Sequence, residues 1–242
     1  MHIRYAGGPT ALLELGGVRL MVDPTFDPPG EHPVGSRSLT KTAGPAFDPQ
    51  PVDVVLLSHD QHPDNLDNAG RAFLATAPLV LSTASAAERI GSPVLALPNW
   101  TSTEVGPLTI TGVPAQHGPD GTENLTGEVT GFVLEGEGLP TVYVSGDNAS
   151  LDVVKAVAER FPSIDVALLF MGAARTPLIP DANLTLSSED AVVAADLLGA
   201  AEIVPLHFEH WAHFTQGRET VAAAFAGRPI HLLDPGQSVE LG

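Results

Sequence analysis

The 242-residue sequence has no cysteine, few basic residues and no long apolar run. The absence of cysteine excludes a disulfide scaffold, a cysteine-ligated zinc finger, an iron–sulfur cluster and a cysteine nucleophile. Only 11 Lys and Arg stand against 29 Asp and Glu, and the net charge of −18 argues against nucleic acid or an anionic membrane as a partner. No apolar run approaches the roughly 18–20 residues that cross a bilayer.

The remaining composition is that of an ordinary globular protein, with 43% apolar and 17% charged residues. Glycine and proline are spread along the whole length without forming a linker, so we expect one domain over residues 1–242. The first residues lack the basic head and apolar stretch of a secretory signal, which favours a cytoplasmic protein. The expected partner is a small molecule, and a homo-oligomer is left open.

Strands at the start of the chain and strand–helix alternation further on predict an α/β sandwich of sheets flanked by helices. A segment rich in Pro and Gly, residues 27–50, is expected to form a long irregular loop. The expected strands are 3–5, 11–15, 18–22, 52–57, 79–82, 94–97, 108–113, 129–134, 141–145, 165–169, 202–206, 230–233 and 238–241. The expected helices are 65–77, 84–90, 151–161, 187–198 (capped by Ser187 or Ser188) and 215–226.

Two histidines and three acidic residues lie within nine residues, directly after the apolar run 52–57. Imidazole and carboxylate together suit Zn²⁺, Mn²⁺, Fe²⁺ or Ni²⁺, and a strand end holds its ligands rigidly. This segment therefore indicates a metal site, with a polar helix cap followed by a solvated loop as the alternative. Its residues are His59, Asp60, His62, Asp64 and Asp67.

Three further polar residues each follow an apolar strand in a turn marked by Gly or Pro. Each of them alone is weak evidence. Strand ends that lie side by side, however, bring such groups together at one edge of a sheet, and four sites in this order predict a metal centre. The three residues are His117, Asp147 and His207.

The order of these residues resembles the metallo-β-lactamase superfamily, whose signature is His-x-His-x-Asp-His, then a His, a Gly-Asp and a last His. The sequence is most similar to the ascorbate-6-phosphate-lactonase-like branch, with the N-acyl-phosphatidylethanolamine phospholipase D group as a more distant relative. The resemblance begins at residues 7–13 (GGPTALL) and 20–26 (LMVDPTF) and reaches 211–214 (WAHF). It implies an α/β fold, the αβ/βα four-layer sandwich of the metallo-β-lactamase type.

Two positions depart from this signature. When the aspartate of the signature is aligned with Asp64, His62 takes the second histidine position. The first histidine position is then occupied by Asp60, and His59 lies one residue before it. The last histidine of the signature is Asn65, and an amide oxygen binds a transition metal more weakly than imidazole does. The two metal pockets that the resemblance implies are His59 or Asp60 with His62, His117 and Asp147, and Asp64, Asn65, Asp147 and His207.

The choice between His59 and Asp60 depends on the backbone. A regular strand points Asp60 and His62 to the same face, whereas a bulge or turn is needed to bring His59 beside His62. We expect the bulge, because imidazole is the better ligand and Pro63 favours a local irregularity. Asp60 then points away and holds a neighbouring loop.

The resemblance implies hydrolysis by metal-bound hydroxide, because a divalent ion lowers the pKa of bound water from about 15.7 to about 7. Asp64 would orient the water or carry its proton, and Asp147 would bridge two ions or complete the shell of one. His213 would protonate the leaving group, while His210 and Trp211 would flank the substrate. The alternative for the two histidines is a polar start to the last helix.

Two residues outside the signature are also candidates. Arg175 follows strand 165–169 at the level of the metal cluster and would bind a phosphate or carboxylate, with a surface loop residue as the alternative. Asp23 follows strand 18–22 and would support a ligand histidine, with a turn cap before Pro24 as the alternative.

The sequence therefore predicts a metal-dependent hydrolase that acts on a small-molecule ester, lactone or phosphodiester. One or two divalent ions are expected, with Zn²⁺ favoured and Mn²⁺ or Ni²⁺ as alternatives. The other interpretation is a metal-poor member of the same fold that binds a ligand or partner without catalysis. No Gly-x-Gly-x-x-Gly, Gly-Lys-Ser loop or Gly-x-Ser-x-Gly elbow is present, which sets aside nucleotide-binding and serine-hydrolase functions.

Overall fold

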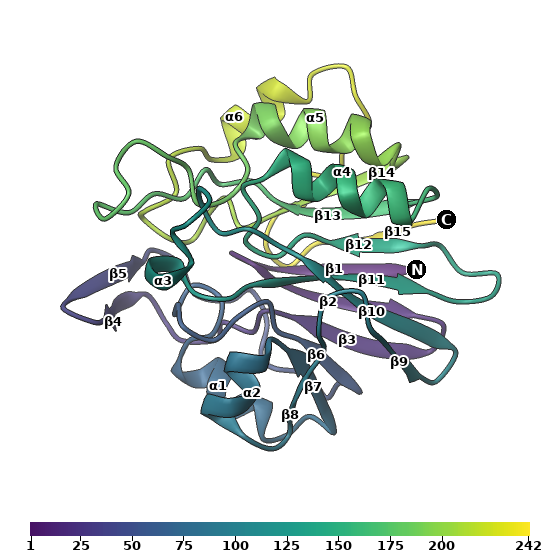
Figure 1. The fold of residues 1–242 in the computed structure, drawn as a ribbon, viewed down its shortest axis with the longest axis horizontal. Helices are drawn as coiled ribbons and strands as arrows, with labels where there is room; N and C mark the ends of the chain where they lie inside the picture. The colour runs from purple at the N-terminus through teal and green to yellow at the C-terminus, as the bar shows by residue number, and fades with distance from the viewer.

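Two β-sheets form the centre of the protein, and the computed structural model describes residues 1–242 (Figure 1). The first sheet has the strand order β15 (Ser238–Glu240), β1 (His2–Gly7), β2 (Thr10–Leu15), β3 (Val18–Val22), β6 (Val54–Leu56), β7 (Leu79–Ser82), β8 (Val94–Ala96). The second sheet has the order β14 (Glu202–Leu206), β13 (Val166–Phe170), β12 (Val142–Val144), β11 (Thr130–Glu135), β10 (Leu108–Pro114), β9 (Ser102–Val105).

Helices lie on the outer side of each sheet (Figure 1). The first sheet is accompanied by α1 (Asn68–Leu74) and α2 (Ala84–Ile90), and the second by α4 (Leu151–Arg160), α5 (Ser188–Leu198) and α6 (Arg218–Ala224). The single turn α3 (Glu123–Thr126) lies among the loops. The resulting order of helix, sheet, sheet and helix confirms the four-layer α/β sandwich that the sequence predicts.

The strands next to the helices are apolar on both faces. Every residue of β6 and of β13 is buried, because each strand has a helix layer on one side and the other sheet on the opposite side. One cluster of 42 buried residues joins both sheets with α4 and α5, and a second of 12 packs α1 against the first sheet. This burial makes the strand ends rigid supports for the loops that follow them.

Helix caps decide two boundaries that the sequence left approximate. Ser187 caps α5 by accepting a hydrogen bond from the backbone N–H of Asp190, as expected. Asp67 caps α1 through the N–H of Gly70, so the helix begins at Asn68 rather than at Asn65. The residues between the end of β6 and this cap form an irregular segment in which Asn65 is buried.

Three expectations about strands were wrong. The segment 27–50 contains a hairpin of β4 (Gly30–Val34) and β5 (Arg37–Lys41), whose largely exposed strands lack apolar alternation. Strand β9 was not expected, because it is a polar edge strand. The expected strand 230–233 is absent. Its His231 N–H donates one backbone hydrogen bond to the carbonyl of Ile203 in β14, but the segment forms no regular strand pairing.

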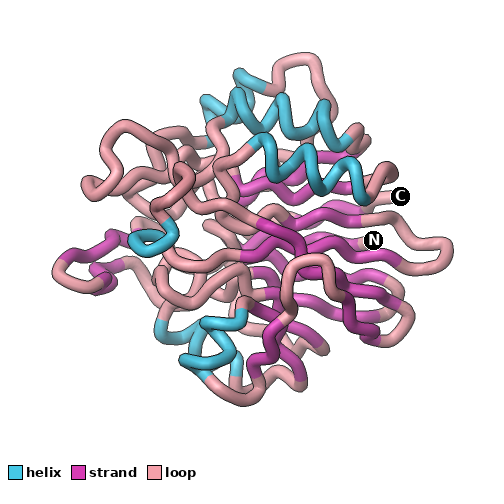
Figure 2. Tube along the Cα trace, in the orientation of Figure 1, coloured by secondary structure: helices cyan, strands magenta, loops and turns pink.

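Loops gather at one end of the two sheets, beside the β4–β5 hairpin and α3, while both chain termini lie toward the opposite end (Figure 2). The polar residues singled out from the sequence lie in these loops and at the strand ends that lead into them. No helix combines the length and apolar character that crossing a membrane requires.

Candidate metal centre

Four strands of the two sheets lead into segments that carry a His or Asp. His59 comes after β6, His117 after β10, Asp147 after β12 and His207 after β14. His207 is buried and has φ of +56°, a left-handed conformation that residues with a side chain adopt uncommonly. Such a conformation persists where the surrounding structure fixes it, and it is frequent at functional sites.

The first group consists of three histidines whose ring nitrogens face one another. Nε2 of His59 lies 2.9 Å from Nδ1 of His62, which lies 3.2 Å from Nε2 of His117. Oδ2 of Asp147 lies 3.4 Å from that last nitrogen. One ligand atom from each of the four residues lies within 4.8 Å of the others, as a shared metal ion requires.

The second group shares Asp147 with the first. Oδ1 of Asp147 lies 3.6 Å from Nε2 of His207, and Oδ2 of Asp64 lies 3.1 Å from the same nitrogen. Nε2 of His213 lies 3.0 Å from Oδ2 of Asp64. The convergence of His62, His117, Asp147 and His207, predicted from the sequence, is therefore observed.

The donor set fits a divalent metal. Three buried oxygens, Oδ1 of Asp64, Oδ1 of Asn65 and Oδ2 of Asp147, have no hydrogen-bond partner. Buried polar atoms normally have one, so three unpartnered oxygens on residues of this cluster, together with three converging ring nitrogens, fit a cation. Imidazole with carboxylate is the donor combination of zinc and related transition-metal sites.

The surroundings of His59, His62 and Asp64 favour the protonation states that bind a metal. Burial, together with the nearby His117, lowers the pKa of His62 to about 4, and burial with His62 lowers the pKa of His59 well below its usual value. Burial alone would raise the pKa of Asp64, but His213 and His207 outweigh it and hold that pKa well below its usual range. Neutral imidazole and ionised carboxylate are the forms that bind a metal.

Asp23 supports the first group through Ser58. Its Oδ1 accepts a hydrogen bond from the backbone N–H of Ser58 and its Oδ2 one from Oγ of Ser58, both at 2.6 Å. Oγ of Ser58 in turn lies 3.0 Å from Nδ1 of His59. Burial raises the pKa of Asp23 to about 7. The expected contact between Asp23 and a ligand histidine is thus relayed by one hydroxyl group.

The structure shows which of His59 and Asp60 lies in the histidine cluster. His59 lies in the cluster, whereas Asp60 accepts two hydrogen bonds of 3.1 Å from Nε of Arg89 and lies 3.6 Å from Nη2 of Arg71. The regular strand ends at Leu56, so the alternation of a strand does not govern the residues that follow. Asp60 points away from the cluster, as expected, but its partners lie on the helices α1 and α2 and not on a loop.

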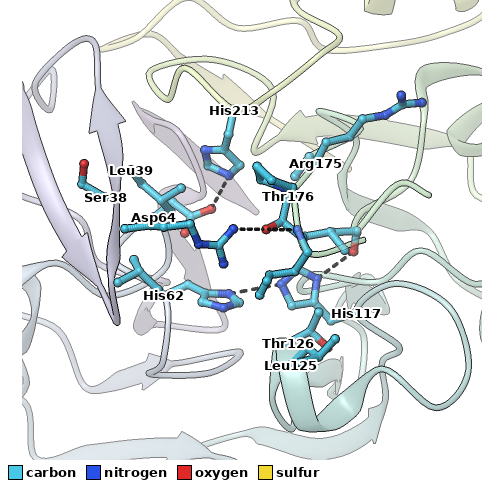
Figure 3. A pocket seen from close by; sticks show the side chains of 16 residues that line it. Ser38, Leu39, His62, Asp64, His117, Leu125, Thr126, Arg175, Thr176 and His213 are labelled. Carbon is cyan, nitrogen blue, oxygen red and sulfur yellow. Dashed lines mark hydrogen bonds and ion pairs between the residues drawn. The ribbon is translucent and has the colours of Figure 1, made fainter. Parts of the chain in front are cut away.

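A cavity of about 450 Å³ opens onto the cluster (Figure 3). His62, Asp64, His117 and His213 lie on its lining. Its other walls come from the β4–β5 hairpin, from α3 and from the loop that follows β13. The residues of these walls are Val34, Arg37, Ser38, Leu39, Leu125, Thr126, Ala174, Arg175, Thr176, Pro177, Leu178 and Leu184.

Three residues expected at the substrate are placed differently. Trp211 is buried outside the cavity lining, with Nζ of Lys41 5.4 Å from its ring centre. His210 packs against Gly7, where an added Cβ would come within 2.1 Å of its ring, and it is also outside the lining. Arg175 lines the cavity, but its Nε donates to Asn183 and its guanidinium points away from the histidines in Figure 3.

The hairpin wall, including Arg37, was missed from the sequence. The only available signal was a basic residue inside a long proline-rich segment of a chain with few basic residues. Such a residue is ordinarily a solvated surface group.

Comparisons with known proteins agree with this geometry. Residues 18–208 match the Beta-lactamase superfamily domain. A UPF0173 metal-dependent hydrolase of Pelotomaculum thermopropionicum is 30% identical over 202 residues, which cover 78% of this chain and 83% of the relative. Another, from Methanosphaerula palustris, is 27% identical over 100% of both chains. The isothiocyanate hydrolase from Delia radicum gut bacteria, at 22% identity, covers 100% of this chain and 99% of its own with a TM-score of 0.84, which shows a shared fold.

The strand order, the flanking helices and the His/Asp cluster at the strand ends together define a metal-dependent hydrolase with the metallo-β-lactamase fold. The chain belongs to the UPF0173 metal-dependent hydrolase family of the β-lactamase superfamily.

Proposed function

We propose that the protein hydrolyses an ester, lactone or phosphodiester bond of a small molecule, using one or two divalent ions, with Zn²⁺ preferred and Mn²⁺ or Ni²⁺ as substitutes. The supporting observation is the convergence of ring nitrogens and carboxylate oxygens at a cavity of about 450 Å³. When bound, the metal supplies a water of lowered pKa and polarises the attacked carbonyl or phosphoryl oxygen. The ligands in this proposal are His59, His62, His117 and Asp147 for one ion, and Asp64, Asn65, Asp147 and His207 for the other.

Asp64 and His213 would carry the proton transfers. The carboxylate of Asp64 faces the cavity and is held ionised by its two histidine neighbours, so it can orient a water and accept its proton. His213 lies 3.0 Å from that carboxylate and also lines the cavity, so it can pass a proton to the leaving group. Asp23 would hold His59 in orientation through Ser58.

The substrate is proposed to be small, because the cavity volume lies at the lower end of the range for small-molecule sites. The similarity of the opening and Asp-Pro segments to ascorbate-6-phosphate-lactonase-like proteins supports lactones among the substrates. A net charge of −18 disfavours nucleic acids and anionic membranes. A cytoplasmic location and one domain over the whole chain stay predictions, and a homo-oligomer is left open.

Elemental analysis and a substrate screen test this proposal. The purified protein is expected to carry about one or two Zn²⁺ per chain and to lose hydrolysis on chelation and regain it with added Zn²⁺. The panel contains γ-butyrolactone, 4-nitrophenyl acetate, bis(4-nitrophenyl) phosphate and, because of the related fold of the isothiocyanate hydrolase, phenethyl isothiocyanate.

Paired variants provide the control. His117→Ala is expected to abolish metal binding and hydrolysis, whereas His231→Ala, which changes a histidine paired with Glu202 outside the cluster, should retain both. A wild-type protein that binds no metal and hydrolyses nothing in the panel would instead support the non-catalytic interpretation.

A further inference from the structure

Arg37 reaches across the cavity from one wall to the other. It is the first residue of β5, in the hairpin wall, and its Nη1 donates a 2.9 Å hydrogen bond to Oγ1 of Thr176 in the loop that follows β13. Both residues line the cavity, as do His62 and His117 of the metal cluster. The exposed guanidinium group of Arg37 therefore lies on the lining of the cavity that opens onto the metal cluster.

This guanidinium has no carboxylate partner, although the chain has 29 acidic residues. The neutral hydroxyl of Thr176 is the one acceptor for its side chain, which carries five N–H donors. Most donors of Arg37 are thus free for a ligand. Six other basic side chains do form ion pairs with Asp or Glu. They are Arg19, Lys41, Arg71, Arg89, Arg218 and Arg228.

The walls around Arg37 are apolar. The hairpin supplies Val34 and Leu39, α3 supplies Leu125, and the opposite loop supplies Leu178. Leu125 and Leu178 are large apolar side chains that are 48% and 52% exposed. Apolar side chains left exposed together beside a cavity are typical of ligand contact surfaces.

We propose that Arg37 recognises an oxyanion on the substrate, which consists of an apolar body with a carboxylate, phosphate or sulfonate group. The anion would lie against Arg37, the body against the leucine walls and the scissile bond against the metal cluster. An oxyanion is a stronger acceptor for a guanidinium than a hydroxyl, so it displaces Thr176. The position of the scissile bond rests on the proposed function, whereas the anion site does not.

Arg175 is the matched control for this role. It is the other Arg on the lining, but its Nε is bonded to Asn183 and its guanidinium points away from the cluster (Figure 3). The proposal therefore assigns the anion to Arg37 on the hairpin and not to Arg175, the candidate that the sequence suggests.

Binding of two fluorescent probes tests the assignment without any hydrolysis. The probe 8-anilinonaphthalene-1-sulfonate has an apolar body and one sulfonate, and N-phenyl-1-naphthylamine has the same body without charge. Both are titrated into the purified wild type, Arg37→Gln, Arg37→Lys and Arg175→Gln. The titrations are repeated after chelation, because a probe that binds the metal directly loses affinity when the metal is removed.

Arg37→Gln is expected to lower the affinity for the sulfonate probe about tenfold, since a hydrogen bond to a charged group is lost. The affinity for the neutral probe should not change. Arg37→Lys should recover part of the affinity, and Arg175→Gln should change neither probe. Displacement by 4-phenylbutyrate and by phenyl phosphate, with 4-phenylbutanol as the uncharged control, separates a carboxylate from a phosphate preference.

Three results would overturn the proposal. In the first, the wild type does not bind the sulfonate probe, or Arg37→Gln does not change its affinity. In the second, Arg37→Gln lowers the affinity for the neutral probe as much as that for the sulfonate probe. In the third, Arg175→Gln lowers the affinity for the sulfonate probe as much as Arg37→Gln does. Because all readouts are equilibrium affinities, a protein that binds the anion through Arg37 but hydrolyses nothing would refute the proposed function alone.

Discussion

Nδ2 of Asn65 donates a 3.0 Å hydrogen bond to Oδ1 of Asp147, the residue that the two metal groups share. The same nitrogen donates a second 3.0 Å bond to Oδ2 of Asp23, while Oδ1 of Asn65 has no partner. Asn65 therefore joins two buried carboxylates through its amide nitrogen, and its buried amide oxygen is left without a partner. Such an oxygen is a weaker ligand for a transition metal than the imidazole that the signature has at this position.

We predict that Asn65→His raises the number of Zn²⁺ ions per chain, because an imidazole completes the second group. Elemental analysis after dialysis measures the change, and unchanged circular dichroism shows that the fold is retained. Asn68→His, at an exposed position that begins α1, is the matched control and should leave the metal content unchanged. Two tightly bound ions in the unmodified protein would show that Asn65 does not weaken this pocket.

His59→Ala and Asp60→Ala should separate metal binding from structural support. His59→Ala removes a ring nitrogen from the first group, so we expect loss of bound metal. Asp60→Ala should keep the metal but lower the free energy of unfolding by about 1–3 kcal/mol, because it removes the hydrogen-bonded partner of Arg89. If Asp60→Ala loses the metal while His59→Ala retains it, the assignment of His59 is wrong.

His213→Ala is expected to lower kcat by about 10²–10⁴-fold without loss of metal, as removal of a proton-transfer group does. His213 contacts Asp64 and lines the cavity, but it belongs to neither group of converging ligand atoms. His210→Ala, which changes a histidine packed against Gly7 outside the cavity, is the control and should retain kcat. Equal activity of wild type and His213→Ala would remove this residue from the mechanism.

The metal-free protein should lose stability as the pH falls from about 6.5 to about 4. Burial and His117 lower the pKa of His62 to about 4 in the folded state, against about 6.5 in the unfolded state. Between these values the unfolded state binds more protons, so each such histidine lowers the free energy of unfolding by up to about 1.4 kcal/mol per pH unit.

Urea unfolding at several pH values in the presence of a chelator measures this effect, and His62→Gln should show a shallower dependence in the same range. Asp23, whose pKa is raised to about 7, acts with the opposite sign, because its buried carboxyl costs stability when the pH rises toward 7. The same slope for wild type and His62→Gln would contradict the contribution assigned to His62.

Elements with strong local signals were predictable from the sequence. The fully buried β6 and β13 have continuous apolar runs, and His117, Asp147 and His207 each follow a strand. The residues between His59 and Asn65 were predictable as a group, since their types suit a metal. Their individual directions were not, because an irregular segment has no periodicity from which to read them.

The cavity walls were the least predictable part of the molecule. The strands of the β4–β5 hairpin are mostly polar and show no regular alternation of apolar residues, so the sequence does not distinguish them from a loop. Arg37 and Thr176 are 139 residues apart, and only the folded chain brings them together. Trp211 resembles a substrate contact in sequence, yet packing beside Lys41 and His32 buries it.

The hairpin wall depends on a buried ion pair between Lys41 of β5 and Asp67 at the start of α1. Nζ of Lys41 lies 2.8 Å from Oδ2 of Asp67, and the two side chains are 1% and 0% exposed. The carboxylate also accepts hydrogen bonds from the backbone N–H groups of Phe26, Asp27 and Gly70. One buried acid therefore connects the hairpin, the segment that leads into it and the first helix.

We predict that Lys41→Met lowers the free energy of unfolding by about 3–5 kcal/mol, because Asp67 is left as a buried charge without a counter-ion. The double variant Lys41→Met with Asp67→Asn should recover part of this loss, since a neutral amide does not need the ammonium group. Urea unfolding measures both, with exposed Lys155→Met as a control that should change little. A loss below about 1 kcal/mol for Lys41→Met would mean that the backbone hydrogen bonds alone stabilise Asp67. The hairpin would then be held by its backbone contacts with residues 210–212, which include a hydrogen bond from the N–H of Ala212 to the carbonyl of Thr40.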